Sequence, residues 1–440
     1  MVFVAVVAAM VFAGPSAAVA AVGDVRVGQT IAHNMAGAVE IGADDPLYTA
    51  QDTTVSPDGA SVYVVSDGQR EFHAASVSHF LRAPDGSLTF AGCIGDKPPC
   101  RFVTSDLLLY ANHVVARDSV VFVLADFKIL AFYRNTRGDL TYASCAAARS
   151  FPGCTVYPQL GDDMYGLGVS PDARDVYALG RRGLSAGAVI QLRYDPRTGT
   201  LGYVGCIGDA YAGCVQTVAT HILGEPIALV MSSDGRSLYA GAWAAGAITH
   251  FRRDPSTGTL REAGCIGYVG GVSDGLSGCT TIGVNSIDVG WMALTRAGDS
   301  LYVTALEDVG HLRRDVNTGD LSYAGCIGHL AGCTVAGPNG SYGPLVTAPD
   351  GGSVYIDDQS HGLLHYRRAA NGDLSYAGCI GEADPAWCTQ TGLHGALNTG
   401  VRGLAVSPDS RSVYAVNADG GAITHLIRQT SDSSLPALLP

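Results

Sequence analysis

One histidine of this chain stands where four of its repeated segments carry leucine. His113 ends the run Asn112-His113, and Asp126 follows on the next apolar segment. If the chain turns back near residues 117–119, His113 lies opposite about residue 124, and Asp126 is its diagonal neighbour on the same face. A carboxylate beside an imidazole fixes the tautomer and raises the basicity, which suits a general base that activates water. The sequence predicts this pair; the alternative is a polar pair without turnover.

The leucines at the position equivalent to His113 are Leu167, Leu229, Leu345 and Leu404. A shift of one residue in strand register would turn Asp126 to the opposite face and separate the pair.

Cysteines are the second group of residues that could do chemistry. The 12 cysteines fall into close pairs with six to thirteen intervening residues. The pairs are Cys93 with Cys100, Cys145 with Cys154, Cys206 with Cys214, Cys265 with Cys279, Cys326 with Cys333, and Cys379 with Cys388. We expect six local disulfides, each adding roughly 2–3 kcal/mol at most. A metal site is disfavoured because no C-x2-C occurs and the spacings vary.

The elements that would position these residues are repeated seven times. An aromatic residue in a segment like Ser-Val-Tyr-Val recurs every 53 to 63 residues. The seven positions are Tyr63, Phe122, Tyr177, Tyr239, Tyr302, Tyr355 and Tyr414. Each unit contains four short segments with the alternation of strands, separated by turns such as Ser56-Pro57-Asp58-Gly59 and Asp254-Pro255-Ser256-Thr257-Gly258. The pattern predicts an all-β fold, a seven-bladed β-propeller with four antiparallel strands per blade.

The two ends of the chain predict how the ring closes. The seventh unit has three strand-like segments and then stops, whereas residues 24–34 precede the first unit where a fourth strand would fall. We expect the N-terminal segment to complete the last blade, which removes the free sheet edges. The expected organisation is one propeller domain over residues 22–430 and a C-terminal tail over 431–440.

Histidines also occur within the repeat itself, in the third segment of five units. They are His79, His250, His311, His365 and His425, with Ala131 and Gln191 in the other two units. A site residue should break the repeat, and these follow it. We therefore interpret them as structural residues, together with the neighbouring arginine pairs such as Arg252-Arg253.

The repeats resemble the lactonase-type seven-bladed propellers, which include 6-phosphogluconolactonases and carboxymuconate cyclases. The likeness lies in the segment Phe251–Leu260, in Ser-Pro-Asp-Gly and in Ser-Val-Tyr-Val, and it spans roughly residues 24–428. The resemblance implies the fold, and a histidine and an acidic residue at the positions of His113 and Asp126. Family members usually carry Pro-Arg-His and Glu there. Here Asn112 replaces the arginine, so we expect a substrate-binding role for Asn112 but no charge from it.

Two functions of different classes remain open. The first is a lactonase-like hydrolase acting on a sugar lactone or related cyclic ester, without a cofactor. The second is a non-catalytic propeller that binds an extracellular protein, a peptide or a glycan through loops stapled by disulfides, with Trp387 as a binding residue in one of them. A metal-dependent gluconolactonase would need a set such as Glu307, Asn285 and Asp288, and we disfavour it.

The N-terminus and the composition predict where the protein works. Residues 2–13 are uninterruptedly apolar and Ala18-Val19-Ala20 fits a cleavage site, so we expect a signal peptide over 1–21. The run is too short to span a membrane, although an uncleaved anchor is the alternative. A formal net charge of −13 without a basic run disfavours nucleic acid. We expect a secreted, cell-surface or periplasmic monomer that associates with a membrane only through its signal segment.

Overall fold

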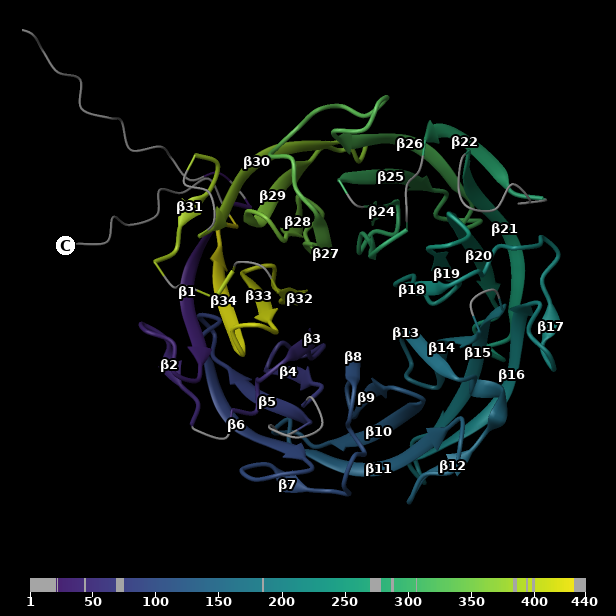
Figure 1. Ribbon diagram of the computed structural model, residues 1–440, viewed down its shortest axis with the longest axis horizontal. Coiled ribbons are helices and arrows are strands. Elements are labelled where there is room, and N and C mark those ends of the chain that lie inside the picture. Colours follow the sequence, from purple (N-terminus) through teal and green to yellow (C-terminus); the bar gives the residue numbers. More distant parts are fainter. Residues whose placement is uncertain are drawn as a thin grey trace, which may run out of the picture.

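The computed structural model is a ring of seven β-sheets arranged around a common axis (Figure 1). It describes residues 21, 23–42, 45–68, 75–183, 186–269, 278–285, 289–305, 307–382, 386–392, 395–397 and 400–430. The predicted signal peptide and C-terminal tail lie outside these residues, except for Ala21. We number the blades 1 to 7 in chain order. The predicted all-β, seven-bladed propeller is confirmed.

Each blade contributes four antiparallel strands, ordered from the ring axis outward. The inner strands are β3 (Ala50–Val55), β8 (Ala111–Ala116), β13 (Asp163–Val169), β18 (Pro226–Met231), β23 (Met292–Leu294), β27 (Tyr342–Thr347) and β32 (Val401–Val406). The second strands are β4 (Ser61–Ser66), β9 (Val120–Ala125), β14 (Asp175–Arg182), β19 (Ser237–Ala242), β24 (Ser300–Thr304), β28 (Ser353–Asp358) and β33 (Ser412–Asn417).

The outer half of each blade repeats in the same way. The third strands are β5 (Ser76–Arg82), β10 (Lys128–Arg134), β15 (Ala186–Asp195), β20 (Ala247–Arg253), β25 (Asp308–Arg314), β29 (Gly362–Arg368) and β34 (Ala422–Arg428). The fourth strands are β6 (Leu88–Gly95), β11 (Leu140–Ala147), β16 (Thr200–Asp209), β21 (Leu260–Val269), β26 (Leu321–Gly328), β30 (Leu374–Gly381) and, in blade 7, β1 (Val25–Ala32).

Six blades carry a fifth strand that the sequence analysis did not predict. These strands are β2 (Val39–Glu40), β7 (Arg101–Phe102), β12 (Thr155–Val156), β17 (Val215–Gln216), β22 (Thr280–Asn285) and β31 (Thr389–Gln390), and each pairs in parallel with the fourth strand. In blade 5 a single bridge between Ile327 and Thr334 takes this place. Most of these strands are only two residues long, too short for hydropathy alternation to reveal.

The first and last blades are joined as predicted. Strand β1 pairs antiparallel with β34, from Val25 opposite Arg428 to Ala32 opposite Ala422. The blade therefore takes its three inner strands from the end of the chain and its fourth from the start. A ring closed in this way leaves no long exposed sheet edge.

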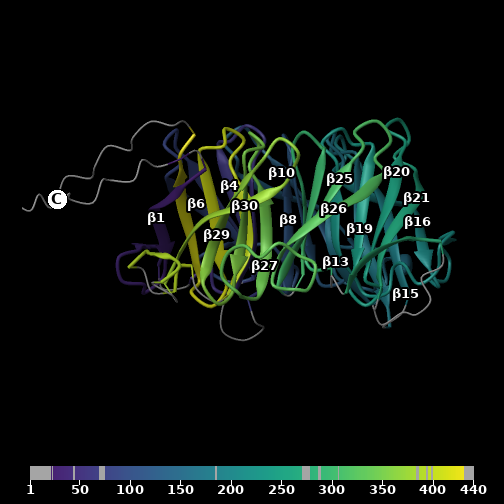
Figure 2. The same cartoon turned by 90° about the horizontal axis from the view of Figure 1, so that it is seen from above.

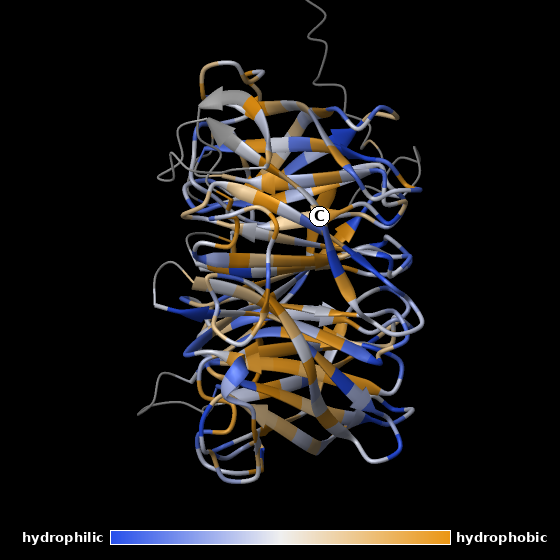
Figure 3. Cartoon of the chain, turned by 90° about the vertical axis from the view of Figure 1, so that its right-hand side faces the viewer, coloured by the Kyte–Doolittle hydropathy of each residue, from blue (hydrophilic) through white to orange (hydrophobic). Residues whose placement is uncertain are grey.

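The core lies between the faces of neighbouring blades, so every blade needs both of its neighbours. The second strands are buried along their whole length in blades 1, 2, 4, 5, 6 and 7. Apolar strands packed between polar turns are visible in Figure 3. The only helix in the described part of the chain is the 3₁₀ turn η1 (Pro158–Leu160), and none there is long and apolar enough to cross a membrane.

The repeated tyrosine and arginine join neighbouring blades. The hydroxyl of Tyr63 in blade 1 donates to the carbonyl of Gly138 in blade 2 (2.6 Å) and accepts from Nε of Arg134 (2.9 Å). Arg134 also pairs with Asp58 in the turn that precedes β4 (2.7 Å). The same tyrosine–arginine contact, 2.7 to 2.9 Å long, spans six of the seven blade junctions.

The five repeated histidines lie behind this contact. His250 stacks on Tyr239 with ring centroids 4.9 Å apart, and its Nε2 lies 3.1 Å from the hydroxyl of Ser237. The other four histidines make the same two contacts. Burial lowers the pKa of His250 to about 4, so the ring is neutral at physiological pH. This placement agrees with the structural role expected for these histidines.

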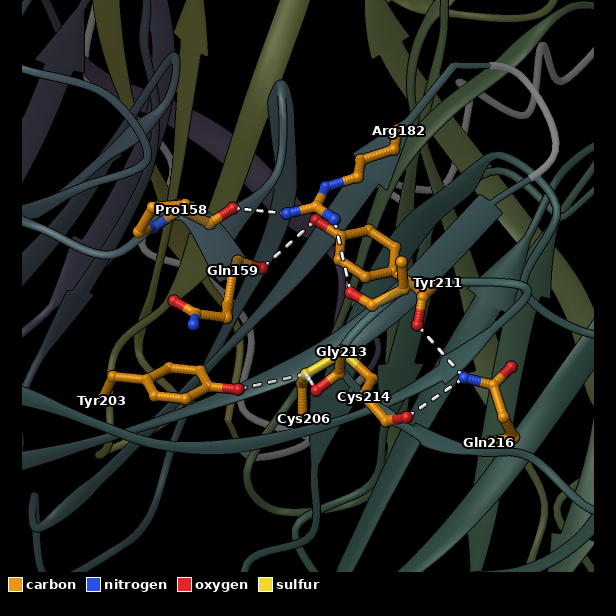
Figure 4. Close-up of a disulfide and its surroundings, with 10 residues drawn as sticks. Pro158, Gln159, Arg182, Tyr203, Cys206, Tyr211, Gly213, Cys214 and Gln216 are labelled. Carbon is orange, nitrogen blue, oxygen red and sulfur yellow. Dashed lines mark hydrogen bonds between the residues drawn. A yellow bond between two sulfur atoms is a disulfide. The ribbon is translucent and has the colours of Figure 1, made fainter.

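All six predicted cysteine pairs form disulfides, and no cysteine is free. Each bond links the fourth strand to the connection that leads to the next blade. In blade 3 the hydroxyl of Tyr203 donates to the sulfur of Cys206, and Gln216 donates to the carbonyls of Tyr211 and Cys214 (Figure 4). The disulfides therefore fix the outer edge of the ring and the start of each connection. Figure 2 shows the ring from the side, with loops between the strands at both of its ends.

Candidate functional site

One end of the ring carries the starts of the inner strands together with the disulfides. In blade 1, Ala50 at the start of β3 pairs with Ser66, Ser66 with Ser76, and Ser76 with Gly95 at the end of β6. The turns between second and third strands lie at the same end. We call this end the disulfide face.

The inner strands are irregular at the disulfide face. Six of them shift register against the second strand near their first residues, which leaves bulged residues next to the ring axis. Bulges are common beside active sites because they re-aim a side chain out of the regular alternation. Gln51, Asn112 and Arg402 are such residues in blades 1, 2 and 7. Polar residues of three neighbouring blades therefore occupy the bulges of the inner strands.

His113 takes its carboxylate partner from the neighbouring blade. The hairpin turns at residues 117–119 as expected, and His113 pairs with Leu124, as the sequence predicted. Its Nδ1 lies 3.7 Å from Oδ2 of Asp52 in β3. Asp52 is itself fixed, because it accepts hydrogen bonds from the backbone N–H groups of Thr53 (2.8 Å) and Val114 (3.0 Å). The histidine side chain remains 35% exposed, so solvent and small molecules reach it.

Asp126 occupies a different place from the one predicted beside His113. It follows β9 in the turn to β10 with a positive φ of 54°, and its carboxylate pairs with Arg149 (3.5 Å). Arg149 covers the ring of Phe127 at 3.8 Å. The positive φ takes Asp126 out of the strand alternation on which the diagonal geometry depended. The structure thus gives the position beside His113 to Asp52, and the predicted role of Asp126 rests on the sequence alone.

A buried lysine lies beside Asp126. Lys128 is 2% exposed, and its ammonium lies 4.5 Å and 4.8 Å from the ring centres of Phe127 and Phe151. Burial lowers the pKa of Lys128 to about 8, with Asp126 acting in the opposite direction. The cation–π contacts retain part of the charge stabilisation that water would give.

The other two predicted binding residues lie apart. Asn112 is the bulged residue immediately before His113, and its Oδ1 is buried without a hydrogen-bond partner. Trp387 is exposed and packs edge-on against Tyr376 in the fourth strand β30, with ring centres 6.1 Å apart. Because β30 lies at the outside of blade 6 and β8 at the inside of blade 2, Asn112 lies with His113 and Trp387 does not (Figure 1).

Two arginines at the disulfide face supply positive charge that the sequence analysis missed. Arg402 is exposed on β32 and precedes Gly403, where an added Cβ would lie 2.7 Å from Cα of Asp52. In blade 3, Arg181 pairs with Asp163 (2.9 Å) and with Glu225 of blade 4 (3.6 Å). Sequence separation hides these neighbours, although Arg402 is the one charged residue within its own strand.

A buried carboxyl group lies between blades 6 and 7. Both oxygens of Asp357 in β28 are buried without a hydrogen-bond partner. Desolvation raises the pKa of Asp357 well above its ordinary value; nearby Asp358 raises it further, and Arg402 lowers it. Equivalent positions in blades 1, 2 and 7 carry Val65, Leu124 and Val416. Asp357 therefore breaks the repeat close to the axis.

The residues considered for a metal do not form a visible site. Asp288 lies outside the described residues, as does the side chain of Asn285, while Glu307 is exposed in the turn before β25. In the described part of the chain, no group of three or more His, Cys, Asp or Glu side chains could hold a metal ion.

Comparison with known proteins supports the fold. No protein-family model and no curated protein matches the chain. Among solved structures, the periplasmic gluconolactonase of Pseudomonas aeruginosa is similar, with a TM-score of 0.53, 17% identity, and coverage of 77% of this chain and 86% of that one. A proposed 6-phosphogluconolactonase from Bacteroides uniformis gives a TM-score of 0.50, 16% identity, and coverage of 76% and 84%. A protein of unknown function from Desulfotomaculum acetoxidans gives 0.51, 13%, 80% and 90%. At these identities the likeness establishes the seven-bladed propeller fold.

Proposed function

We propose that this protein is an exported hydrolase of a lactone or related cyclic ester, with His113 as the general base. The observation that carries the proposal is the partly exposed His113 beside the fixed carboxylate of Asp52, at 3.7 Å across the junction of blades 1 and 2. A histidine and a carboxylate converging from separate chain segments beside the axis form an arrangement suited to general-base catalysis.

The geometry gives each residue of the pair a separate task. Asp52 faces Nδ1 of His113 and orients the ring, which leaves Nε2 to remove a proton from a water molecule. The resulting hydroxide attacks the ester carbonyl, the ring C–O bond breaks, and the imidazolium returns its proton to the leaving alkoxide. The product is an open hydroxy acid. The exposed Arg402 lies on β32, the inner strand next to β3. It provides positive charge for a carbonyl oxygen or a substrate carboxylate.

Two further observations support the compartment and the substrate class. Six disulfides fit an extracellular or periplasmic location, where disulfides persist. The similar structures named above include a periplasmic gluconolactonase and a proposed 6-phosphogluconolactonase. We extend their substrate class, sugar lactones, to this chain.

The decisive experiment measures lactone hydrolysis by pH-stat with a panel of sugar lactones and aromatic-derived lactones, corrected for spontaneous opening. We expect His113→Ala to lower kcat/KM by about 10²-fold or more, the usual contribution of a general base. We expect Asp52→Asn to lower it by about 10-fold, the low end of what an orienting partner contributes. Asp126→Asn is the matched control, since the same substitution at a carboxylate not placed against His113 should have little effect.

The outcomes separate the assignments. A loss with Asp126→Asn and none with Asp52→Asn would restore the pair predicted from sequence. Turnover that survives His113→Ala in a protein with an unchanged circular dichroism spectrum would place the chemistry elsewhere. The absence of turnover on every lactone tested would contradict the proposed hydrolase activity.

A second candidate function is ligand binding without catalysis, and exposed tryptophans favour it. Trp243 in the turn after β19 is 47% exposed, and Trp291 just before the inner strand β23 is 37% exposed. Exposed aromatic side chains beside polar groups serve as contact surfaces for ligands. If no lactone is hydrolysed, loss of ligand binding in Trp291→Ala would support this function.

A further inference from the structure

Three grooves with the same lining lie on the outer side of the ring, away from the axis. They lie at the junctions of blades 1 and 2, 4 and 5, and 5 and 6, with volumes of about 360, 190 and 360 Å³. Each is lined by the repeated histidine, by a glycine and a cysteine of the fourth strand, and by an aspartate from the next blade. The two larger grooves have the volume of a small-molecule site.

We propose that these grooves are equivalent binding sites for a polyhydroxylated ligand such as a hexose unit of a glycan, several per chain. The inference is independent of hydrolysis at His113, because the grooves lie on the third and fourth strands and the catalytic pair lies on the inner strands.

The histidine and aspartate of each groove act as a unit. Nδ1 of His79, His250 and His311 lies 3.7, 3.5 and 3.7 Å from Asp139, Asp320 and Asp373, respectively. A fourth pair, His365 and Asp24, lies 3.6 Å apart. Where the third strand lacks histidine, the facing residue is not aspartate: Ala131 faces the turn with Thr200, and Gln191 the turn with Thr259. Four of the five repeated histidines therefore face an aspartate, whereas the fifth, His425, faces the turn that carries Ser87.

In the groove between blades 4 and 5, part of the histidine–aspartate pair is left available to a ligand. Nε2 of His250 is used by Ser237, whereas its Nδ1 is buried without a hydrogen-bond partner and belongs to a residue that lines the groove. The carboxylate of Asp320 is 53% exposed. His250 is only 3% exposed. A ligand hydroxyl in the groove would give its buried Nδ1 the hydrogen-bond partner that it lacks.

A bulged glycine keeps each groove open. Gly92, Gly264 and Gly325 have φ of 137°, 145° and 144°, and a Cβ added at any of them would meet no atom within 4 Å. The positive φ selects glycine at the bulge. In blade 2 the equivalent residue is Ser144, whose hydroxyl instead donates to the carbonyl of Gly199 (2.6 Å). Blade 2 thus lacks both the histidine and the open glycine, whereas blade 3 lacks the histidine and keeps the glycine as Gly205.

The lining favours a neutral ligand rich in hydroxyl groups. Burial lowers the pKa of the three histidines, so the imidazoles are neutral. Each groove also contains one aspartate, and in the groove between blades 1 and 2 the charge of Arg101 opposes that of Asp139. A carboxylate beside an imidazole nitrogen accepts and exchanges hydrogen bonds with neighbouring hydroxyls. Side chains such as Ile94 and Leu140 provide the apolar wall that the C–H face of a sugar ring would contact.

Isothermal titration of the whole protein with the methyl glycosides of glucose, galactose, mannose and N-acetylglucosamine tests the proposal. We expect at least one glycoside to bind with a stoichiometry between two and four. The double variant Asp320→Asn, Asp373→Asn should lower that stoichiometry by about two and leave the affinity of the remaining sites unchanged. Because both carboxylates are exposed, the substitutions retain the fold, which circular dichroism checks.

Asp254→Asn with Asp315→Asn is the matched control. These aspartates lie in the same type of turn, where they accept backbone hydrogen bonds that asparagine also accepts, and neither lines a groove. The control should bind as the wild type does. Failure of all four glycosides to bind overturns the proposal, as does a stoichiometry of one that Asp320→Asn, Asp373→Asn leaves unchanged.

Discussion

The junction between blades 2 and 3 differs from the other six. At those six, a tyrosine on the second strand donates to a turn carbonyl of the next blade and accepts from an arginine of that blade. At the junction of blades 2 and 3, Phe122 and Tyr194 replace the tyrosine and the arginine and meet edge to face at 5.1 Å. Packing replaces a polar network.

Compensating changes accompany this replacement. The carbonyl of Gly199, which would accept from a tyrosine, accepts from Ser144 instead. Arg117 at the turn of blade 2 donates to the carbonyls of Val169 (2.5 Å) and Ser170 (3.1 Å) in blade 3, and burial lowers its pKa to about 10. Blade 2 also carries His113, so the blade that departs most from the repeat contains the candidate base. The contacts that repeat from blade to blade stabilise the ring, whereas the blade that departs from them carries the candidate base.

Removing the arginine from a polar junction should give the largest effect. Arg253 pairs with buried Asp175 and donates to Tyr177 (2.9 Å). Arg253→Ala leaves a buried carboxylate with fewer partners, so we expect a loss of about 3–5 kcal/mol in the free energy of unfolding. Urea denaturation measures it, with Tyr194→Phe at the aromatic junction as the control that should change little. A loss below about 1 kcal/mol for Arg253→Ala would contradict a stabilising role for the tyrosine–arginine–aspartate contacts between the blades.

The repeated histidines should make the polar junctions sensitive to acid. The pKa of His250 is about 4 in the folded protein and about 6.5 in the unfolded chain, so the unfolded state binds more protons between these values. Stability contributed by His250 is therefore complete above pH 6.5 and is lost as the pH falls towards 4. Relative to His250→Gln, which copies blade 3, the wild type should lose about 2–3 kcal/mol between pH 7.5 and 4.5.

Denaturation of the two proteins across that range measures the difference. Asp45 and Asp357, whose pKa values are raised, titrate in the opposite sense but are present in both proteins and cancel. A difference that does not change with pH would show that His250 has the same pKa in the folded protein as in the unfolded chain.

Exchanging the aromatic residues between the two kinds of junction should destabilise both. Tyr239→Phe leaves Nε of Arg314 and the carbonyl of Gly319 without their partner. Phe122→Tyr inserts a hydroxyl where Gly199 is already bonded and no arginine faces it. We expect each to cost about 1–3 kcal/mol, measured by thermal and urea unfolding. If Phe122→Tyr stabilised the protein, the aromatic junction would be less stable than a polar junction at the same place.

The fold was largely predictable because the repeat supplies seven copies of each signal. The aromatic position, the turns and the cysteine pairs recur, so errors in one unit are corrected by the others. The pairing of His113 with Leu124 also followed from the turn position. The fifth strands did not, since a strand of two residues has no periodicity to detect.

The candidate site was predicted only in part. His113 could be recognised because it breaks the repeat, and Asp126 was chosen because it is near in sequence. The structure instead brings Asp52 to His113 from another blade, and places Arg402 and Asp357 around the same axis. No pattern within one unit reports which residue of the neighbouring unit it will meet.

The sequence by itself determined the seven units, their closure by the N-terminal strand and the six disulfides, because these depend on local periodicity, turn chemistry and the spacing of cysteines. Only the tertiary structure decided which side chains meet. Contacts between blades depend on bulges such as that at Asn112 and on the left-handed turn at Asp126, each of which redirects a side chain. A shift of one residue in a strand moves a side chain to the opposite face of the sheet. Such a shift therefore changes which residue lies beside His113.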